Sequence, residues 1–262
     1  MGWSSKRGAD GRESIVQVTA NTEGAAPAWL VLPTYNEASN LEAIVTAIRD
    51  RLDPGGHLLI VDDSSPDGTG QIADRLSADH RDVSVLHRPI KEGLGPAYVA
   101  GFREALASGA PLIAQMDADF SHDPADLPRL FAASRDADVV LGSRYVDGGG
   151  VTQWGPIRRL ISRGGSAYAR TVLGVPIRDL TGGFKVFRRE VLEAIDLGSI
   201  SSFGYAFQVE TTYRAIRAGF RVTELPIVFR DRRVGESKMS KRIVFEAAWR
   251  VPAMRLPGRR EA

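Results

Sequence analysis

Between residues 29 and 141, short apolar runs alternate with longer stretches of helical periodicity, and this alternation constrains the fold more than any other feature of the chain. Such alternation is typical of βαβ units, in which helices cover both faces of a parallel sheet. We therefore expect an α/β fold with a Rossmann-like, mostly parallel sheet flanked by helices on both faces. The expected strands are 29–32, 58–61, 83–86, 112–116 and 139–141, and the expected helices are 39–52, 70–78, 96–107 and a short one after Pro124.

The start of the first expected helix carries a local signal. Ser39 stands three residues before Glu42, which is the spacing of a capping box. In that motif the two side chains accept hydrogen bonds from main-chain N–H groups that the first helical turn leaves without partners. We therefore expect Ser39 to cap the helix.

The composition indicates one folded domain with a distinct segment on either side. Of the 262 residues, 43% are hydrophobic and 25% are charged, which is enough for a large core. Residues 1–27 are rich in Gly, Ser, Ala and charge without a sustained period, and we expect a disordered tail there. The domain is expected to span 28–240. In 241–262 an aromatic, apolar face lies among cations, which suits either a membrane-interface helix or a last helix packed on the domain.

The charge of the chain is balanced overall but uneven along the sequence. The formal net charge is +2, yet from Arg144 to Arg189 nine basic residues stand against two acidic ones. This asymmetry indicates an anionic ligand or surface, and no nucleic-acid signature accompanies it, so we expect no nucleic-acid partner. No run approaches the roughly 18 apolar residues of a spanning helix. The absence of cysteine excludes disulfides and favours a reducing compartment.

Polar clusters follow three of the expected strands, at 33–37, 62–69 and 117–119. Each could separately be a turn. In open parallel sheets, however, ligands bind outside the carboxyl ends of the strands, so the three clusters should converge on one rim. Asp117 and Asp119 are two residues apart on extended backbone and therefore face the same side. Paired carboxylates suit magnesium or manganese bound together with a diphosphate.

In this order, the clusters and several later strings resemble the inverting glycosyltransferases of family 2, which have the GT-A fold. Within the family, the likeness is to the dolichol-phosphate (polyprenol-phosphate) mannose synthases, and it runs from about Trp29 to Lys241. The strings that carry it are Leu32-Pro33-Thr34-Tyr35-Asn36-Glu37, Val61-Asp62-Asp63-Ser64-Ser65-Pro66-Asp67-Gly68-Thr69, Met116-Asp117-Ala118-Asp119-Phe120-Ser121-His122, Gly142-Ser143-Arg144-Tyr145, Ser162-Arg163-Gly164, Asp179-Leu180-Thr181-Gly182-Gly183-Phe184 and Gly235-Glu236-Ser237-Lys238.

The resemblance implies a pocket for a nucleotide-sugar donor. The residues expected around the nucleotide, with the last two beside its base and ribose, are Pro33, Tyr35, Glu37, Val61 and Asp63. A donor of this kind leaves as a nucleoside diphosphate, whose developing charge a divalent metal can neutralise. We therefore expect magnesium or manganese as the cofactor.

The metal and the diphosphate are expected at Asp117, Ala118 and Asp119, by the same resemblance. Some relatives have a glutamine ligand two residues after the second aspartate, where this chain has Ser121, a weaker ligand. His122, beside the aspartates, is interpreted as a structural or helix-entry residue rather than a ligand or a base.

The cationic contacts come from the second half of the chain. Arg144, Arg232 and Lys238 resemble the family's contacts to donor and acceptor phosphates. Arg158 and Ser162 are four residues apart and share a helix face, so they could grip the acceptor phosphate, although a plain helix surface would show the same spacing. The residues expected to be catalytic are Asp119 and Arg144.

The favoured function is inverting transfer of mannose from GDP-mannose to a polyprenyl monophosphate, whose phosphate oxygen is already anionic and needs no strong base. One alternative is transfer of glucose or another hexose from a uridine nucleotide to the same lipid. A second is a non-catalytic subunit that binds nucleotide sugars. The lipid acceptor implies a peripheral protein at the cytoplasmic face of a membrane, held there by the membrane surface or by a small membrane subunit.

Overall fold

The computed structural model describes residues 27–200, 202, 204–231 and 249–255. Apart from Pro27, the tail expected at 1–27 lies outside the described residues, and so do Arg232, Lys238 and most of 241–262. The three-part division of the chain therefore stays a prediction. Within the described part of the chain, no helix is long and apolar enough to cross a membrane.

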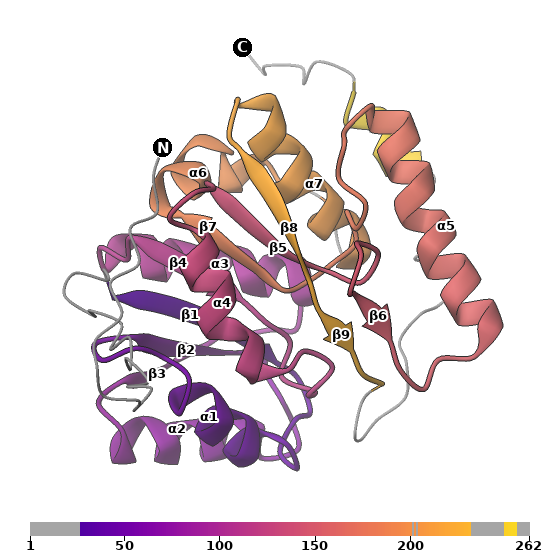
Figure 1. Cartoon of the computed structure of the whole chain (residues 1–262). Helices are drawn as coiled ribbons and strands as arrows, with labels where there is room; N and C mark the ends of the chain where they lie inside the picture. Colours follow the sequence, from indigo (N-terminus) through magenta and orange to yellow (C-terminus); the bar gives the residue numbers. More distant parts are fainter. Residues whose placement is uncertain (1–26, 201, 203, 232–248, 256–262) are drawn as a thin grey trace, which may run out of the picture.

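A seven-stranded sheet in the order β3-β2-β1-β4-β7-β5-β8 forms the centre of the molecule (Figure 1). Neighbouring strands are parallel except for β7, which runs antiparallel to both β4 and β5. This arrangement confirms the prediction of a mostly parallel sheet. The strands are β1 (Ala28–Thr34), β2 (His57–Asp62), β3 (Val83–His87), β4 (Leu112–Gln115), β5 (Val139–Ser143), β7 (Lys185–Arg188) and β8 (Val222–Pro226), and β6 (Gly150–Val151) pairs separately with β9 (Val228–Phe229).

Helices cover both faces of this sheet, as the alternation predicts. Apolar side chains of α1, α2 and α4 pack on one face, and those of α3, α6 and α7 pack on the other. At the side of the molecule lies α5 (Figure 1), whose Ala169 and Leu173 belong to a third apolar cluster together with Val209 and Tyr213 of α7. The helices are α1 (Leu41–Arg49), α2 (Thr69–Asp79), α3 (Leu94–Ala107), α4 (Leu127–Ala133), α5 (Pro156–Leu173), α6 (Arg189–Ala194) and α7 (Gly204–Arg217), with short 3-10 turns at Pro124–Asp126 and Leu197–Ser199.

The capping prediction for the first helix is wrong. The helix begins at Leu41, its N-cap residue is Asn40, and no side chain caps it. The reason is a preceding turn, in which the Glu37 carbonyl accepts hydrogen bonds from the main-chain nitrogens of Asn40 (2.9 Å) and Leu41 (3.0 Å). Asn40 Nδ2 in turn donates to Glu37 Oε2 (2.9 Å). Main-chain groups of the loop after β1 thus start this helix, and Ser39 lies within their turn.

The order of the strands fixes where a ligand can bind. The chain passes from β1 to β2 on one side and returns to β4 on the other side of β1. At such a switch point, the loops that leave the carboxyl ends of the two central strands separate and leave a crevice. In this chain those loops begin at Tyr35 and Met116, so the predicted convergence of the polar clusters follows from the topology.

Candidate active site

A cavity of about 300 Å³ opens at the carboxyl ends of β1, β2 and β4. Its lining includes residues from the first half of the chain, such as Tyr35 and Asp117, and residues from the second half, such as Arg144 and Arg158. The sequence-predicted site residues that line it are Pro33, Tyr35, Glu37, Asp63, Asp117, Ala118, Asp119, Ser121, Arg144 and Arg158. The structure therefore brings most of the predicted set into one place.

Two described residues of the predicted set are not among the lining. The Val61 side chain is completely buried in the core, where an added Cβ on Gly101 of α3 would lie 3.0 Å from Val61 Cγ2. The Val61 side chain thus packs under α3 and not in the cavity, and a contact of Val61 with the donor stays a prediction. Ser162 is half-buried on α5, and its Oγ accepts a hydrogen bond from Tyr145 Oη (2.6 Å). Arg232 and Lys238 lie outside the described residues.

The loop after β1 is held in place by the loop after β2. The main-chain nitrogens of Asn36, Glu37 and Ala38 donate to Ser65 Oγ (3.1 Å), Thr69 Oγ1 (2.9 Å) and Asp67 Oδ2 (3.2 Å). These three acceptors belong to the Ser-Ser-Pro-Asp-Gly-Thr string. Its hydroxyl and carboxylate side chains therefore serve as turn residues, and they also shape the first wall of the cavity.

Asp63 organises the next loop along the rim. Its carboxylate accepts hydrogen bonds from the main-chain nitrogens of Glu92 (3.3 Å) and Gly93 (2.8 Å) and pairs with Arg88. The same loop carries Lys91, whose ammonium lies 3.4 Å from the centre of the Tyr35 ring. A cation over an aromatic face is attracted by the ring quadrupole, so this contact closes one side of the cavity.

The two aspartates after β4 have different partners. Tyr98 Oη donates to Asp117 Oδ1 (2.9 Å), and burial together with this carboxylate raises the pKa of Tyr98 well above its usual value. Asp119 Oδ1 accepts a hydrogen bond from the main-chain nitrogen of Ser121 (3.0 Å). Asp117 is thus anchored by α3 beneath the sheet, while Asp119 is anchored by its own loop.

His122 is built into the wall of the cavity. Its ring lies 5.2 Å from the rings of both Phe184 and Phe229, and its Nδ1 accepts a hydrogen bond from the main-chain nitrogen of Asp117 (3.4 Å). Burial lowers the pKa of His122, and the neutral ring is the form that can accept this bond. These contacts support the interpretation of His122 as a structural residue.

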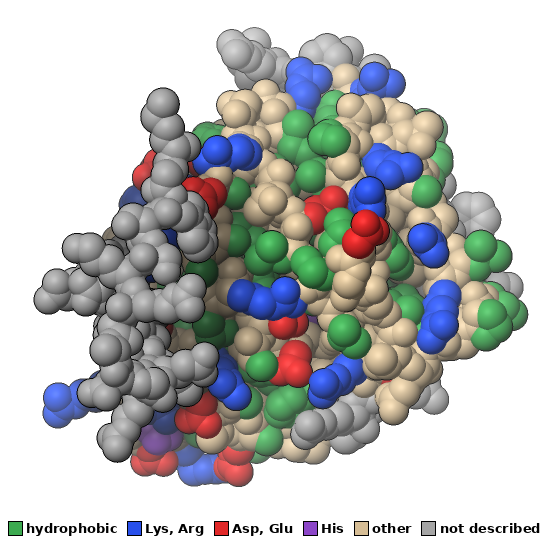
Figure 2. All heavy atoms as spheres, in the orientation of Figure 1, with side chains coloured by type: hydrophobic (Ala, Val, Ile, Leu, Met, Phe, Trp, Pro, Cys, Tyr) green, Lys and Arg blue, Asp and Glu red, His purple; other side chains and the backbone are tan. Residues whose placement is uncertain are grey.

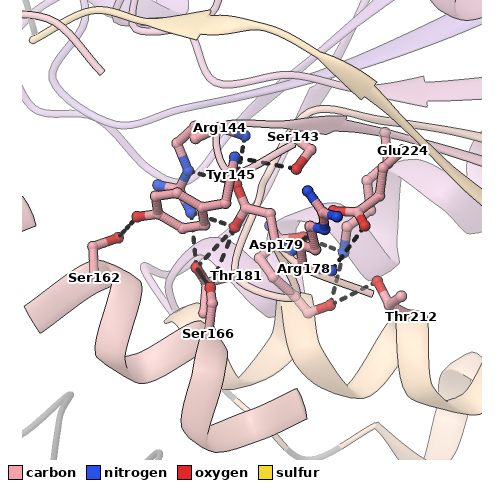
Figure 3. A network of polar contacts seen from close by, with 12 residues as sticks. Ser143, Arg144, Tyr145, Ser162, Ser166, Arg178, Asp179, Thr181, Thr212 and Glu224 are labelled. Carbon is pink, nitrogen blue, oxygen red and sulfur yellow. Dashed lines mark hydrogen bonds and ion pairs between the residues drawn. The ribbon is translucent and has the colours of Figure 1, made fainter. Parts of the chain in front are cut away.

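Arg144 faces the cavity as half of a buried ion pair (Figure 3). Its Nε and Nη2 donate to the two oxygens of Asp179, each at 2.7 Å, and its main-chain nitrogen donates to Asp179 Oδ2 (2.9 Å). Burial, the largest single effect, would lower the pKa of Arg144 and raise that of Asp179, but the opposite charges and the hydrogen bonds together move both pKa values the other way. Thr181 and Ser166 complete the network. Arg144 is therefore not the isolated cation that its motif suggests.

Arg158 forms a second, more open ion pair. Its Nη1 lies 2.8 Å from Asp231 Oδ1, and its guanidinium carbon lies 4.2 Å from the centre of the Trp154 ring. Its Nε is shielded from solvent and has no hydrogen-bond partner among the described residues. Arg158 therefore offers an N–H donor to a ligand on the side of the cavity formed by α5.

Several lining residues carry no role in the sequence-based prediction. They are Lys91, Thr181, Gly183, Tyr205, Gln208 and Phe229, and Tyr98 and Asp179 stand directly behind the lining. Thr181 and Gly183 belong to the string 179–184, which carries part of the resemblance but has no predicted role of its own. In the sequence, Tyr98 and Gln208 each stand between two apolar residues of a helix. Their polar partners are visible only in the structure.

The donor set at Asp117 and Asp119 fits a divalent metal that a diphosphate also coordinates. Two carboxylates and the Ser121 hydroxyl are hard oxygen ligands, and magnesium usually takes only one or two carboxylates and completes its shell with phosphates and water. Ser121 Oγ is buried without a hydrogen-bond partner among the described residues, as expected of a group that awaits a ligand. No group of three or more acidic, His or Cys ligands is present in the part of the chain that the structure describes.

Solved structures with a similar fold are glycosyltransferases. Glucosyl-3-phosphoglycerate synthase of Mycobacterium tuberculosis, in complex with Mn²⁺, UDP and phosphoglyceric acid, superposes with a TM-score of 0.65 at 18% identity, over 89% of this chain and 80% of that one. The same enzyme with Mg²⁺ and UDP gives a TM-score of 0.65 over 89% and 81%. The mostly parallel sheet with its rim cavity is thus a GT-A fold.

The chain belongs to glycosyltransferase family 2, since the model of that family matches residues 29–196. It is 48% identical over 231 residues to the undecaprenyl-phosphate mannosyltransferase of Micrococcus luteus, covering 88% of this chain and 95% of the relative. It is also 48% identical over 233 residues to the polyprenol monophosphomannose synthase of Mycolicibacterium smegmatis, covering 88% and 87%. The resemblance of the sequence motifs to this family is confirmed.

Proposed function

We propose that this chain transfers mannose from GDP-mannose to the phosphate of a polyprenyl monophosphate, with inversion at the anomeric carbon. The observation that carries the proposal is a single cavity lined by both the aspartates Asp117 and Asp119 and the arginines Arg144 and Arg158. The names of the two relatives supply mannose and the polyprenyl phosphate, and the guanosine nucleotide follows from the resemblance.

On the donor side, Tyr35 and Asp63 suit the nucleoside, because they line the cavity between the first two loops. Pro33, near the end of β1, and Glu37, on the loop that follows, would shape that subsite. Asp117, Ala118, Asp119 and Ser121 would hold magnesium or manganese on the diphosphate. When bound, the ion supplies charge that stabilises the leaving diphosphate. Arg232 and Lys238 stay proposed phosphate contacts outside the described residues.

The chemistry asks little of a general base. A phosphomonoester is already largely dianionic at neutral pH, so one of its oxygens can attack the anomeric carbon directly. The new carbon–oxygen bond forms as the bond to the nucleoside diphosphate breaks, and the electron pair leaves with the diphosphate. The protein therefore has to bring two polyanions together and offset their repulsion. Arg144 and Arg158 line the same cavity as the aspartates, Arg158 as the cation for the arriving phosphate and Arg144 as a fixed unit with Asp179.

We further propose that α5 delivers the lipid acceptor at a membrane surface. Ile157 and Leu160 are each 74% exposed, Ile161 is 43% exposed, and Arg159 and Arg163 flank them on the same helix. Apolar and cationic side chains also alternate along the edge of the molecule where α5 lies (Figure 2). An apolar stripe flanked by cations is typical of helices that rest in an anionic lipid interface. Arg158, one position after Ile157, would then meet the acceptor phosphate.

The activity is tested by incubating the full chain with radiolabelled GDP-mannose, magnesium or manganese, and a short polyprenyl phosphate, followed by lipid extraction. Label in the lipid phase that depends on the metal supports the proposal. Label from UDP-glucose and none from GDP-mannose would replace it with the glucosyltransferase alternative. Binding of nucleotide with no transfer from either donor would favour a non-catalytic subunit.

Membrane docking is tested by flotation with vesicles that contain anionic phosphatidylglycerol. The double variant Ile157→Gln, Leu160→Gln should float less than the unaltered chain. Ile90→Gln is a matched control, because Ile90 is 62% exposed on the loop after β3 and lies outside α5. Equal flotation of all three proteins would remove α5 from the membrane interface, without affecting the assignment of the reaction.

A further inference from the structure

A buried network of amides and a lysine lies beneath the inner end of the cavity. Lys185 of β7 is completely buried, and its Nζ donates to Gln208 O (2.7 Å), Gln208 Oε1 (2.9 Å) and Thr211 Oγ1 (3.2 Å). Burial lowers the pKa of Lys185 to about 7. Such a residue is costly in a core unless its donors are satisfied, and here Gln208 of α7 supplies two of the three acceptors.

The orientation of the Gln208 amide is fixed by its partners. Lys185 Nζ donates to the oxygens around it, and as an ammonium it has no acceptor, so the Gln208 side-chain atom that faces it is the oxygen. The same oxygen accepts a hydrogen bond from Gln115 Nε2 (2.6 Å), which also donates to the carbonyl oxygen of Gly183 (2.8 Å). Gln115 therefore has to present its nitrogen as well. With its oxygen held from two directions, the Gln208 amide has to turn its nitrogen the other way.

That nitrogen meets no partner in the described part of the chain. Gln208 is only 3% exposed, its Nε2 is buried, and the residue lines the cavity. Gln115 Oε1 also lacks a partner there, but Gln115 is not among the lining residues. A buried N–H₂ group that is aimed at a cavity and held rigidly from behind is typical of a ligand contact, because leaving it unpaired is unfavourable.

The surroundings of Gln208 Nε2 indicate what it binds. A Cβ added to Gly183 would lie 3.6 Å from Gln208 Nε2 and 3.6 Å from Asp117 Oδ2, so the two atoms border one small space that the glycine leaves open. One atom is a donor and the other an acceptor. An alcohol hydroxyl can accept from the first and donate to the second, whereas an ionised phosphate oxygen can only accept and would give Asp117 Oδ2 no donor. The space therefore suits a sugar hydroxyl.

We propose that Gln208 is a specificity residue that donates a hydrogen bond from Nε2 to a hydroxyl of the donor's hexosyl group, in the space between Asp117 and Gly183. The proposal rests on the proposed function, because it presupposes a nucleotide-sugar donor. Lys185 and Gln115 act through Gln208 as positioning residues. Lys185 also polarises the amide, since a charge-assisted bond at the oxygen strengthens the N–H₂ group as a donor.

The sharpest variant is Gln208→Glu. The carboxylate keeps an oxygen for Lys185 and for Gln115, and it replaces the donor at the cavity with an acceptor. We expect affinity for the intact sugar nucleotide to fall by at least about tenfold, while affinity for the nucleoside diphosphate alone and KM for the polyprenyl phosphate stay within about twofold. Calorimetric titration with each ligand and steady-state kinetics measure these values. Equal losses for the sugar nucleotide and the nucleoside diphosphate would overturn the proposal.

A second arm uses the substrate and avoids the question of folding. A panel of monodeoxy sugar nucleotides, each lacking one hexosyl hydroxyl, is compared in the unaltered protein and in Gln208→Glu. One analogue should lose at least about tenfold in kcat/KM with the unaltered protein and lose little further with the variant, because the contact is already gone. If every analogue loses equally in both proteins, Gln208 does not bind a hydroxyl.

Thr212→Val serves as the matched control. Thr212 is buried on the same helix, its Oγ1 donates to Gln208 O (3.1 Å), and it is not among the cavity-lining residues. It should leave the ranking of the deoxy analogues unchanged. A changed ranking in Thr212→Val would show that any disturbance of α7 suffices, which overturns the specific role of Gln208. An unaltered protein that transfers no hexose would fail the proposed function instead, so the two failures are distinguishable.

Discussion

Two arginine–aspartate ion pairs contribute to the walls of the cavity, and they differ in how deeply they are buried. Arg144 and Asp179 have side chains that are 4% and 0% exposed, whereas Arg158 and Asp231 are 22% and 33% exposed. The first pair is bidentate and joined by hydroxyl groups, and the second is a contact at the mouth of the cavity. A buried pair cannot be separated cheaply, while a half-exposed pair can exchange partners.

This difference divides the work of the two arginines. An acceptor phosphate can displace Asp231 from Arg158 in water, but displacement of Asp179 would leave a buried carboxylate without its cation. We therefore infer that Arg144 contributes as part of a fixed, locally neutral unit that shapes the cavity, and that Arg158 is the cation that binds an arriving phosphate. The experiments below test the two halves of this inference.

The largest expected effect follows from breaking the buried pair. Asp179→Asn should lower the free energy of unfolding by about 3–5 kcal/mol, because Arg144 would keep its charge without a counter-ion. Urea unfolding followed by circular dichroism measures this loss. Asp147→Asn is the matched control, since Asp147 pairs with Arg178 at 3.4 Å on the surface and should unfold like the unaltered protein. Similar midpoints for both variants would contradict the structural role of the Arg144–Asp179 pair.

The next effect concerns catalysis at the acidic rim. Asp119→Asn should lower metal-dependent transfer by about 10²–10³-fold, because one charged metal ligand is lost while the shape of the side chain is kept. It should also abolish the rise in melting temperature that we expect from manganese and GDP together. Asp123→Asn is a control on the same loop, where the side chain accepts a hydrogen bond from Ala125 N (3.0 Å), a role that asparagine can also fill. Transfer by Asp119→Asn at the unaltered rate would refute the metal assignment.

The acidic rim could be predicted from the sequence because its signals are local. The apolar residues of each strand and the turn residues that follow it lie within a few positions of each other in the sequence. The order of the strands then brings the three clusters together. The ion pairs could not be predicted, since Arg144 and Asp179 are 35 positions apart and Arg158 and Asp231 are 73 apart. Val61 is a similar case: its position near a strand end is visible in sequence, but the packing of its side chain beneath α3 is not.

The open pair gives opposite effects from its two partners. If the acceptor phosphate replaces Asp231 on Arg158, Arg158→Met should raise KM for the polyprenyl phosphate by about tenfold, and Asp231→Asn should lower it by about two- to fivefold, because a competitor is removed. Initial rates at saturating donor measure both values. If the pair is only a structural clamp, both variants would raise KM, and Arg158 would lose its proposed role.

The smallest expected effect separates the second acceptor contact from its support. Tyr145 Oη donates to Ser162 Oγ, which leaves the Ser162 proton available for a phosphate. Ser162→Ala should therefore raise KM for the acceptor by about two- to fivefold, close to one ordinary hydrogen bond, and Tyr145→Phe should change it less, because the serine keeps its own donor. The double variant should match Ser162→Ala, since the support no longer matters once the contact is gone. If instead Tyr145→Phe and Ser162→Ala lower stability equally and leave KM unchanged, the hydrogen bond only attaches α5 to the loop after β5. Among the described residues of this helix, Arg158 would then be the one proposed contact to the acceptor.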